Sequence, residues 1–150
     1  MRVNVKVEGI EDVNRALKEM GERQRLEFKQ EVYASALDIQ GQAKDNLKEM
    51  GIWDLGNLAN SLMAETTGDG LTAEIGPTAP YGPYVEFGTR PHFPPPEALE
   101  GWAKRHGFDS AWPICKIIAA RGLSAKPYLY PAWLSLVNEF YERIKRILMK

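Results

Sequence analysis

The sequence predicts an α+β fold, in which a long N-terminal helix packs on a small antiparallel sheet and additional helices follow toward the C-terminus. Two patterns predict it: apolar residues recur at spacings of three and four over a long early segment, and two short apolar segments then flank a glycine-containing turn. A chain of 150 residues can bury a hydrophobic core without disulfides or metal ions. We therefore expect residues 1–150 to form a single domain.

A strand and a long helix are predicted for the first fifty residues. Val3, Val5 and Val7 alternate with polar residues, which indicates a half-buried strand. A short helix should follow, with a joint near Gly21 and then a long helix over about 22–50. The stripe expected to face the sheet consists of Val32, Ala36, Ile39, Ala43 and Leu47.

A β-hairpin is predicted after this helix. The segments 62–67 and 71–75 flank Gly68-Asp69-Gly70, a turn sequence that suits a reversal between short strands. With the N-terminal strand, this gives an antiparallel sheet of at least three strands. Before the hairpin, we expect a short turn over 57–62 that is capped by Asn57.

Residues 76–96 are rich in proline and glycine and are predicted to form an exposed loop, with one turn near 84–87. Three helices should follow: 97–106, 111–121 with Ser110 as its cap, and a last helix after Pro131. The apolar positions that define the last helix are Leu134, Val137, Tyr141, Ile144 and Leu148.

Composition excludes several classes of protein. The N-terminus does not have the pattern of a signal peptide, and no stretch approaches the ~18 apolar residues of a membrane span, so we expect a chain that is soluble in the cytoplasm where it is made. A net charge of −1 argues against a dedicated nucleic-acid binder. The charge is uneven, with −5 over residues 1–76 and +4 over 77–150, so one end of a copy could face the opposite end of a neighbour. Cys115, the single cysteine, is expected in the core.

No catalytic, cofactor-binding or metal-binding residues are predicted. The two histidines, His92 and His106, are fourteen residues apart and have no ligand set at metal-site spacing. Glu86 lies among aromatic residues, where burial can perturb a carboxyl group, but a lone carboxylate does not make a hydrolase. We expect it to accept hydrogen bonds from the backbone or from Arg90.

Two segments carry a resemblance to a known family. They read Tyr81-Gly82-Pro83-Tyr84-Val85-Glu86-Phe87-Gly88-Thr89 and Ala125-Lys126-Pro127-Tyr128-Leu129-Tyr130-Pro131-Ala132. They resemble the "Y…E(F/Y)GT" and "(A/R)PFLxPA" motifs of the gene-product-ten-like proteins of long-tailed bacteriophages. Residues 55–62 resemble the family's "TGxLxxSI" segment, with Leu55 in place of threonine and Leu62 in place of isoleucine.

The resemblance implies a structural virion protein of the phage neck, in tail completion or head–tail joining, that acts by assembly without catalysis. Its partners would be other neck and tail proteins and further copies in a ring, without sequence-specific nucleic-acid recognition. It would be found in the virion, and in the host cytoplasm during assembly. The alternatives are a tail terminator or head connector, or a prophage-encoded metal-dependent enzyme or nuclease accessory.

The predicted assembly interface lies in the proline-rich loop, because aromatic and arginine side chains are enriched at protein interfaces. Prolines also lower the entropy that such a loop loses when it docks. The alternative is that Tyr84 and Phe87 lock the loop onto the core of their own chain. The interface residues are Tyr81, Tyr84, Phe87, Arg90 and Phe93.

Overall fold

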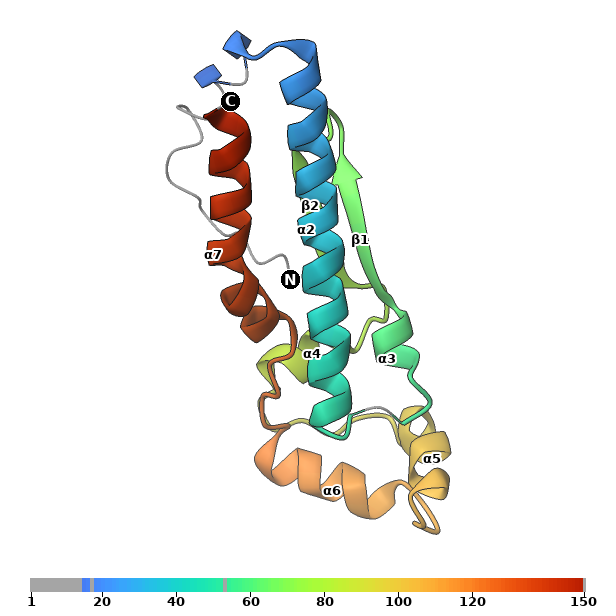
Figure 1. Ribbon diagram of the computed structural model, residues 1–150. Helices are drawn as coiled ribbons and strands as arrows, with labels where there is room; N and C mark the ends of the chain where they lie inside the picture. Colours follow the sequence, from blue (N-terminus) through green and yellow to red (C-terminus); the bar gives the residue numbers. More distant parts are fainter. Residues whose placement is uncertain (1–14, 17, 53, 150) are drawn as a thin grey trace. The chain divides into compact units, whose positions relative to one another are not determined.

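The computed structural model describes residues 15–16, 18–52 and 54–149 (Figure 1). The predicted strand at 3–7 lies outside these residues. The described chain divides into two compact units. The first unit contains the residues up to Pro80 and those from Tyr128 onward, and the second unit contains Tyr81–Pro127.

The long helix of the first unit is α2, Glu22–Glu49. Gly21, with an extended backbone, precedes it, as the predicted joint requires. All five predicted stripe residues are buried, together with Phe28 and Ser35. Ile39 is only 3% exposed. The predicted helix and its buried face are therefore confirmed.

The hairpin consists of β1, Leu62–Thr67, and β2, Thr72–Pro77, which pair antiparallel with Leu62 opposite Pro77 and Thr67 opposite Thr72. The second strand thus begins one residue later and ends two residues later than predicted. The later start follows from the turn: the Leu71 N–H donates to the Asp69 side chain (3.0 Å), so Leu71 belongs to the turn. The strand extends to Pro77 because Gly76 and Pro77 pair with Met63 and Leu62. Within the described residues the sheet has two strands, and the predicted third lies outside them.

One face of the hairpin packs on α2, and the other face points away from it. Residues of the inner face are Leu62, Ala64, Ala73 and Ile75, which are buried or half-buried. The side-chain amide of Gln40 on α2 donates to the carbonyl of Leu62, which ties the start of β1 to the helix. The outer face carries Met63, Glu65 and Glu74, all of which are exposed.

Helix α7, Leu129–Leu148, packs against α2, which lies between α7 and the hairpin (Figure 1). It begins before Pro131, since a proline in the first turn needs no helical hydrogen-bond partner. Its buried residues are Ala132, Ile144 and Ile147. Of the apolar positions that predicted this helix, Ile144 is buried, whereas Leu134, Tyr141 and Leu148 are exposed.

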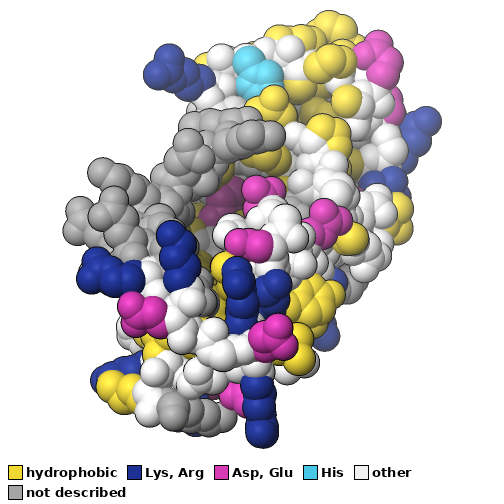
Figure 2. Space-filling view, turned by 90° about the horizontal axis from the view of Figure 1, so that it is seen from above, with side chains coloured by type: hydrophobic (Ala, Val, Ile, Leu, Met, Phe, Trp, Pro, Cys, Tyr) yellow, Lys and Arg dark blue, Asp and Glu magenta, His cyan; other side chains and the backbone are white. Residues whose placement is uncertain are grey.

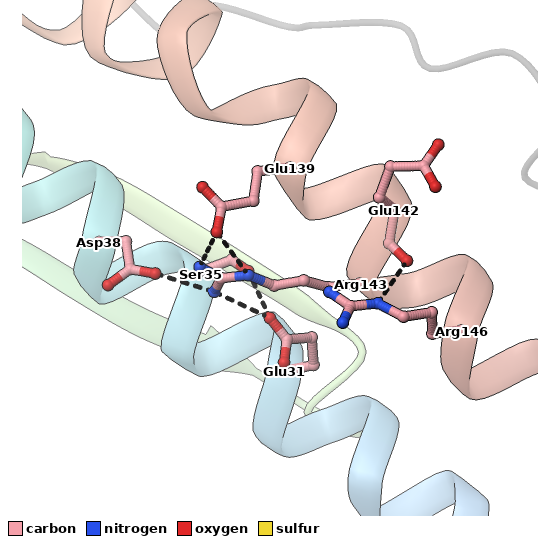
Figure 3. Close-up of polar contacts among 7 residues, drawn as sticks. All are labelled: Glu31, Ser35, Asp38, Glu139, Glu142, Arg143 and Arg146. Atoms are coloured by element: carbon pink, nitrogen blue, oxygen red, sulfur yellow. Dashed lines mark hydrogen bonds and ion pairs between the residues drawn. The ribbon is translucent and has the colours of Figure 1, made fainter.

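An arginine joins α7 to α2 beside the apolar contact. The guanidinium of Arg143 donates to the carboxylates of Asp38 (2.9 Å) and Glu31 (3.2 Å) on α2 and of Glu139 (2.6 Å) on its own helix (Figure 3). Hydrogen bonds to Glu139, Asp38 and Glu31 raise the pKa of Arg143 above its ordinary value, so it remains charged wherever the protein is folded. Arg143 therefore lies on the face of α7 toward α2, whereas Leu134, Tyr141 and Leu148 are exposed.

The remaining helices are short. Helix α3, Asn57–Asn60, begins after Gly56, whose φ of 73° ends the preceding turn, so Asn57 is the first helical residue and not the predicted cap. The second unit contains α4 (Gly82–Phe87), α5 (Pro96–Arg105) and α6 (Trp112–Arg121). The residue before α6 is Ala111, with no side-chain cap, which corrects the prediction for Ser110.

The architecture is α+β, with a long helix against a two-stranded antiparallel sheet and further helices toward the C-terminus, as predicted. Among the described residues, no helix is both long enough and apolar enough to cross a membrane.

Candidate assembly surface

The second unit brings together the loop with the predicted interface and a segment that lies more than thirty residues later. The Thr89 N–H donates to the Leu123 carbonyl (2.9 Å), and the Leu123 N–H donates back to the Thr89 carbonyl (3.2 Å). The Lys126 N–H donates to the Val85 carbonyl (2.8 Å). The segment 85–89 of the first motif is therefore joined by backbone hydrogen bonds to the chain at 123–126, where the second motif begins.

Two glycines make this close approach possible. A Cβ on Gly88 would lie 2.5 Å from the Leu123 carbonyl oxygen, and one on Gly122 would lie 2.1 Å from the Thr89 carbonyl oxygen. Both residues have positive φ, 70° and 72°, a conformation that glycine adopts without strain. Any other residue at either position would push the two segments apart.

Helix α4 presents its aromatic side chains outward. Pro83 lies in its first turn, and its buried residues are Gly82 and Glu86. Tyr84 and Phe87 are 56% and 48% exposed, so about half of each side chain faces solvent. The glycine and the carboxylate occupy the inner positions of α4, which leaves the rings to solvent.

The other predicted interface residues are also exposed. Tyr81 and Phe93 are 44% and 49% exposed, and Arg90 is exposed as well. Phe93 packs against Trp112 of α6, with the ring centroids 5.5 Å apart. Trp112 is itself half-exposed, and it extends the aromatic surface. Nothing in the sequence placed residue 112 beside residue 93, so sequence reasoning missed it.

A small hydrophobic core lies between α5 and α6 of this unit. Ala103, Ala111 and Cys115 are fully buried, which confirms the prediction for Cys115. The Ala111 N–H, at the start of α6, donates to the Glu100 side chain of α5 (3.1 Å) and fixes the two helices together. Outside this core, Trp102 stacks on His106 (4.0 Å between ring centroids).

Each of the two histidines contacts a backbone carbonyl that lies near it in the chain. His92 contacts the Arg90 carbonyl through Nδ1 (2.9 Å), and His106 contacts the Trp102 carbonyl in the same way (2.8 Å). Among the residues the structure describes, no three His, Cys, Asp or Glu side chains gather as a metal-binding group.

Many large hydrophobic side chains are exposed on the surface of the protein. Figure 2 shows them exposed between basic and acidic side chains on one face. In the first unit they include Leu134 and Tyr141 of α7, which are 51% and 50% exposed. Single exposed hydrophobic side chains are normal on a protein surface, whereas contiguous apolar patches mark interaction sites.

The model of a family named HK97-gp10-like, described as "Bacteriophage HK97-gp10, putative tail-component", matches residues 10–88. The chain belongs to this family of bacteriophage tail components, as the motifs had indicated. The match ends at Gly88, so the second motif and α5 to α7 lie beyond it. No curated protein and no solved structure matches the chain.

Proposed function

We propose that this tail component acts at the phage neck, in tail completion or head–tail joining, as a ring of identical copies. It would bind other neck and tail proteins without catalysis, in the cytoplasm during assembly and in the virion afterward. The observation that carries the proposal is the set of exposed aromatic side chains in the second unit of a chain of this family. We call this set the aromatic rim: Tyr81, Tyr84, Phe87, Phe93 and Trp112. Aromatic side chains that are already held in place lose little conformational entropy when they bind a partner, which favours affinity.

The assembly surface of this proposal consists of the predicted residues and one addition, Trp112. Backbone hydrogen bonds at Val85 and Thr89 hold the segment that carries the exposed rings. Arg90 adds a cation at the same segment. Aromatic and arginine anchors of this kind contribute most of the binding free energy in many protein interfaces. The surface residues are Tyr81, Tyr84, Phe87, Arg90, Phe93 and Trp112.

A tail terminator or a head connector is the second candidate, because the same exposed aromatics would serve at those positions. The three roles predict different products when the protein is missing. A joining protein leaves filled heads beside complete tails of normal length, whereas loss of a terminator alters tail length and loss of a connector leaves unfilled heads. Electron microscopy of lysates from a phage lacking this gene would distinguish them.

The surface itself is tested by a variant with both Tyr81→Ala and Phe93→Ala. Because both side chains are half-exposed, we expect the unfolding midpoint to fall by no more than a few degrees. Filled heads and complete tails should accumulate unjoined when this variant replaces the unmodified protein.

A matched control is the variant with Tyr33→Ala and Leu37→Ala on α2, where the side chains are 44% and 41% exposed. It removes a similar apolar area from the first unit and should leave joining intact. Normal joining by the Tyr81/Phe93 variant would contradict the proposed surface. Metal-dependent cleavage of DNA by the purified protein would contradict the non-enzymatic role.

A further inference from the structure

The exposed side of α7 carries an apolar stripe that α2 does not cover. Leu134, Tyr141 and Leu148 are exposed and Val137 is half-buried. With Lys145 they follow spacings of three and four, so all five lie along one line of the helix. We call these residues the α7 stripe: Leu134, Val137, Tyr141, Lys145 and Leu148. It is about 21 Å long at 1.5 Å per residue.

The hairpin has the complementary chemistry on its outer face, which we define by Met63, Glu65, Thr67, Thr72, Glu74 and Gly76. Met63 is an exposed apolar residue. Glu65 and Glu74 stand directly opposite each other across the strand pair. Like charges at opposed positions destabilise a sheet, and the hairpin itself, residues 62–77, contains no lysine or arginine.

Neither of these carboxylates forms an ion pair among the described residues, and Lys145 forms none either. The two faces therefore offer each other an apolar contact and an unneutralised charge of opposite sign. A strand of six residues is about 20 Å long, which matches the length of the α7 stripe.

The two faces lie on opposite sides of α2, because α2 separates α7 from the hairpin (Figure 1). A single copy cannot bring them together, but two copies placed one after the other can. A contact between two different faces is heterologous, and it repeats until a ring closes. A symmetric contact between two α7 stripes would instead leave Lys145 without an acidic partner on either stripe.

We propose that neighbouring copies of this chain associate head to tail, with the hairpin outer face of one copy on the α7 stripe of the next. Met63 lies against Tyr141, and Lys145 neutralises the Glu65 and Glu74 pair. This interface rests on the proposed ring and supplies its subunit contact, whereas the aromatic rim of the second unit binds other phage proteins.

Cysteine cross-linking of the full chain tests the geometry, since the native Cys115 is fully buried and does not compete. Met63→Cys protein mixed with Tyr141→Cys protein should form a mixed disulfide dimer under mild oxidation, in preference to either homodimer. A chain with both substitutions should form a ladder of multimers. Tyr33→Cys, exposed on α2, is the matched control to mix with Tyr141→Cys.

Charge reversal tests the pairing by sedimentation at several concentrations. Glu74→Lys and Lys145→Glu should each weaken self-association by about tenfold, and the chain that carries both reversals should recover it. Asp45→Lys, exposed on α2, should leave self-association unchanged.

Three results would overturn the interface: dominant Tyr141→Cys homodimers, no mixed disulfide above the Tyr33→Cys control, or a lowered unfolding midpoint for Tyr141→Ser. The last would show that Tyr141 contributes to the stability of its own chain. The expected cross-links could form while a phage that lacks this protein still joins heads to tails. That pair of results would support the interface and contradict the proposed role in the neck. If head–tail joining requires the protein but the mixed disulfide does not form, the role in the neck would be supported and the interface contradicted.

Discussion

The contacts inside the first unit of this chain differ in kind from the contacts inside the second unit. In the first unit, large side chains pack between long helices, as in the cluster of Phe28, Val32, Ile144 and Ile147. In the second unit the buried cluster consists of small residues, Ala103, Ala111 and Cys115, and backbone hydrogen bonds between distant segments supply much of the order. A face built from periodic side chains can be predicted from sequence, and a backbone contact that two glycines permit is much harder to predict.

Gly122→Ala should have the largest effect, and it should be confined to the second unit. The added Cβ would meet the Thr89 carbonyl oxygen at 2.1 Å, at a φ of 72°. Neither backbone segment can yield easily, so we expect a cost of about 3 kcal/mol or more. Hydrogen exchange should show lost protection at Thr89 and Leu123 while α2 stays protected.

The same substitution at Gly41 is the matched control. Gly41 lies inside α2, and nothing is within 4 Å of a Cβ built there. Alanine should therefore stabilise the first unit by about 0.5–1 kcal/mol. If Gly122→Ala were as well tolerated as Gly41→Ala, the account of the second unit as a backbone-joined structure would be wrong.

Ile39→Ala should destabilise the first unit by about 2–5 kcal/mol, since it removes a large side chain from the core. The measurement is the free energy of unfolding from a urea titration followed by circular dichroism. Leu37→Ala is the control, because Leu37 is on the same helix but is 41% exposed. A similar loss for the two variants would mean that the buried stripe of α2 does not hold this unit.

Arg143→Gln should have the smallest effect of the three, and salt should reveal it. The side chain of Arg143 is 26% exposed and its three carboxylate partners are between 22% and 56% exposed, so solvent screens the ion pairs. The unfolding midpoint should fall modestly in low salt, and the difference from the unmodified protein should shrink toward 1 M salt, where the Debye length is about 3 Å.

Arg146→Gln is the control for this change, because Arg146 donates to the carbonyl of Glu142 within its own helix. It should show a smaller deficit and less dependence on salt. An Arg143→Gln deficit that persists at high salt would mean that packing of the arginine stem, and not its charge, joins α7 to α2.

Most residues of the candidate surface could be predicted from the sequence, but the contacts that hold them in place could not. The loop drew attention through its prolines and aromatic residues, and each of the five predicted interface residues is exposed. That they serve in assembly stays a prediction. Trp112 could not be placed beside Phe93 from the sequence, because no periodicity relates positions that are nineteen residues apart in different elements.

The sequence by itself determined the α+β class, the buried face of α2, the existence of the hairpin and the family. These depend on local spacing and on motifs, which a single chain displays directly. Only the tertiary structure decided which side of α7 is buried, because that helix has apolar residues on more than one side. Ile144 and Ile147 pack with Phe28 and Val32 of α2 on the inner side, and most of the residues that defined the helix in the sequence are left in solvent. The meeting of Gly88 and Gly122 with distant backbone was likewise a tertiary result, since contacts between backbones leave no periodic trace in the order of side chains.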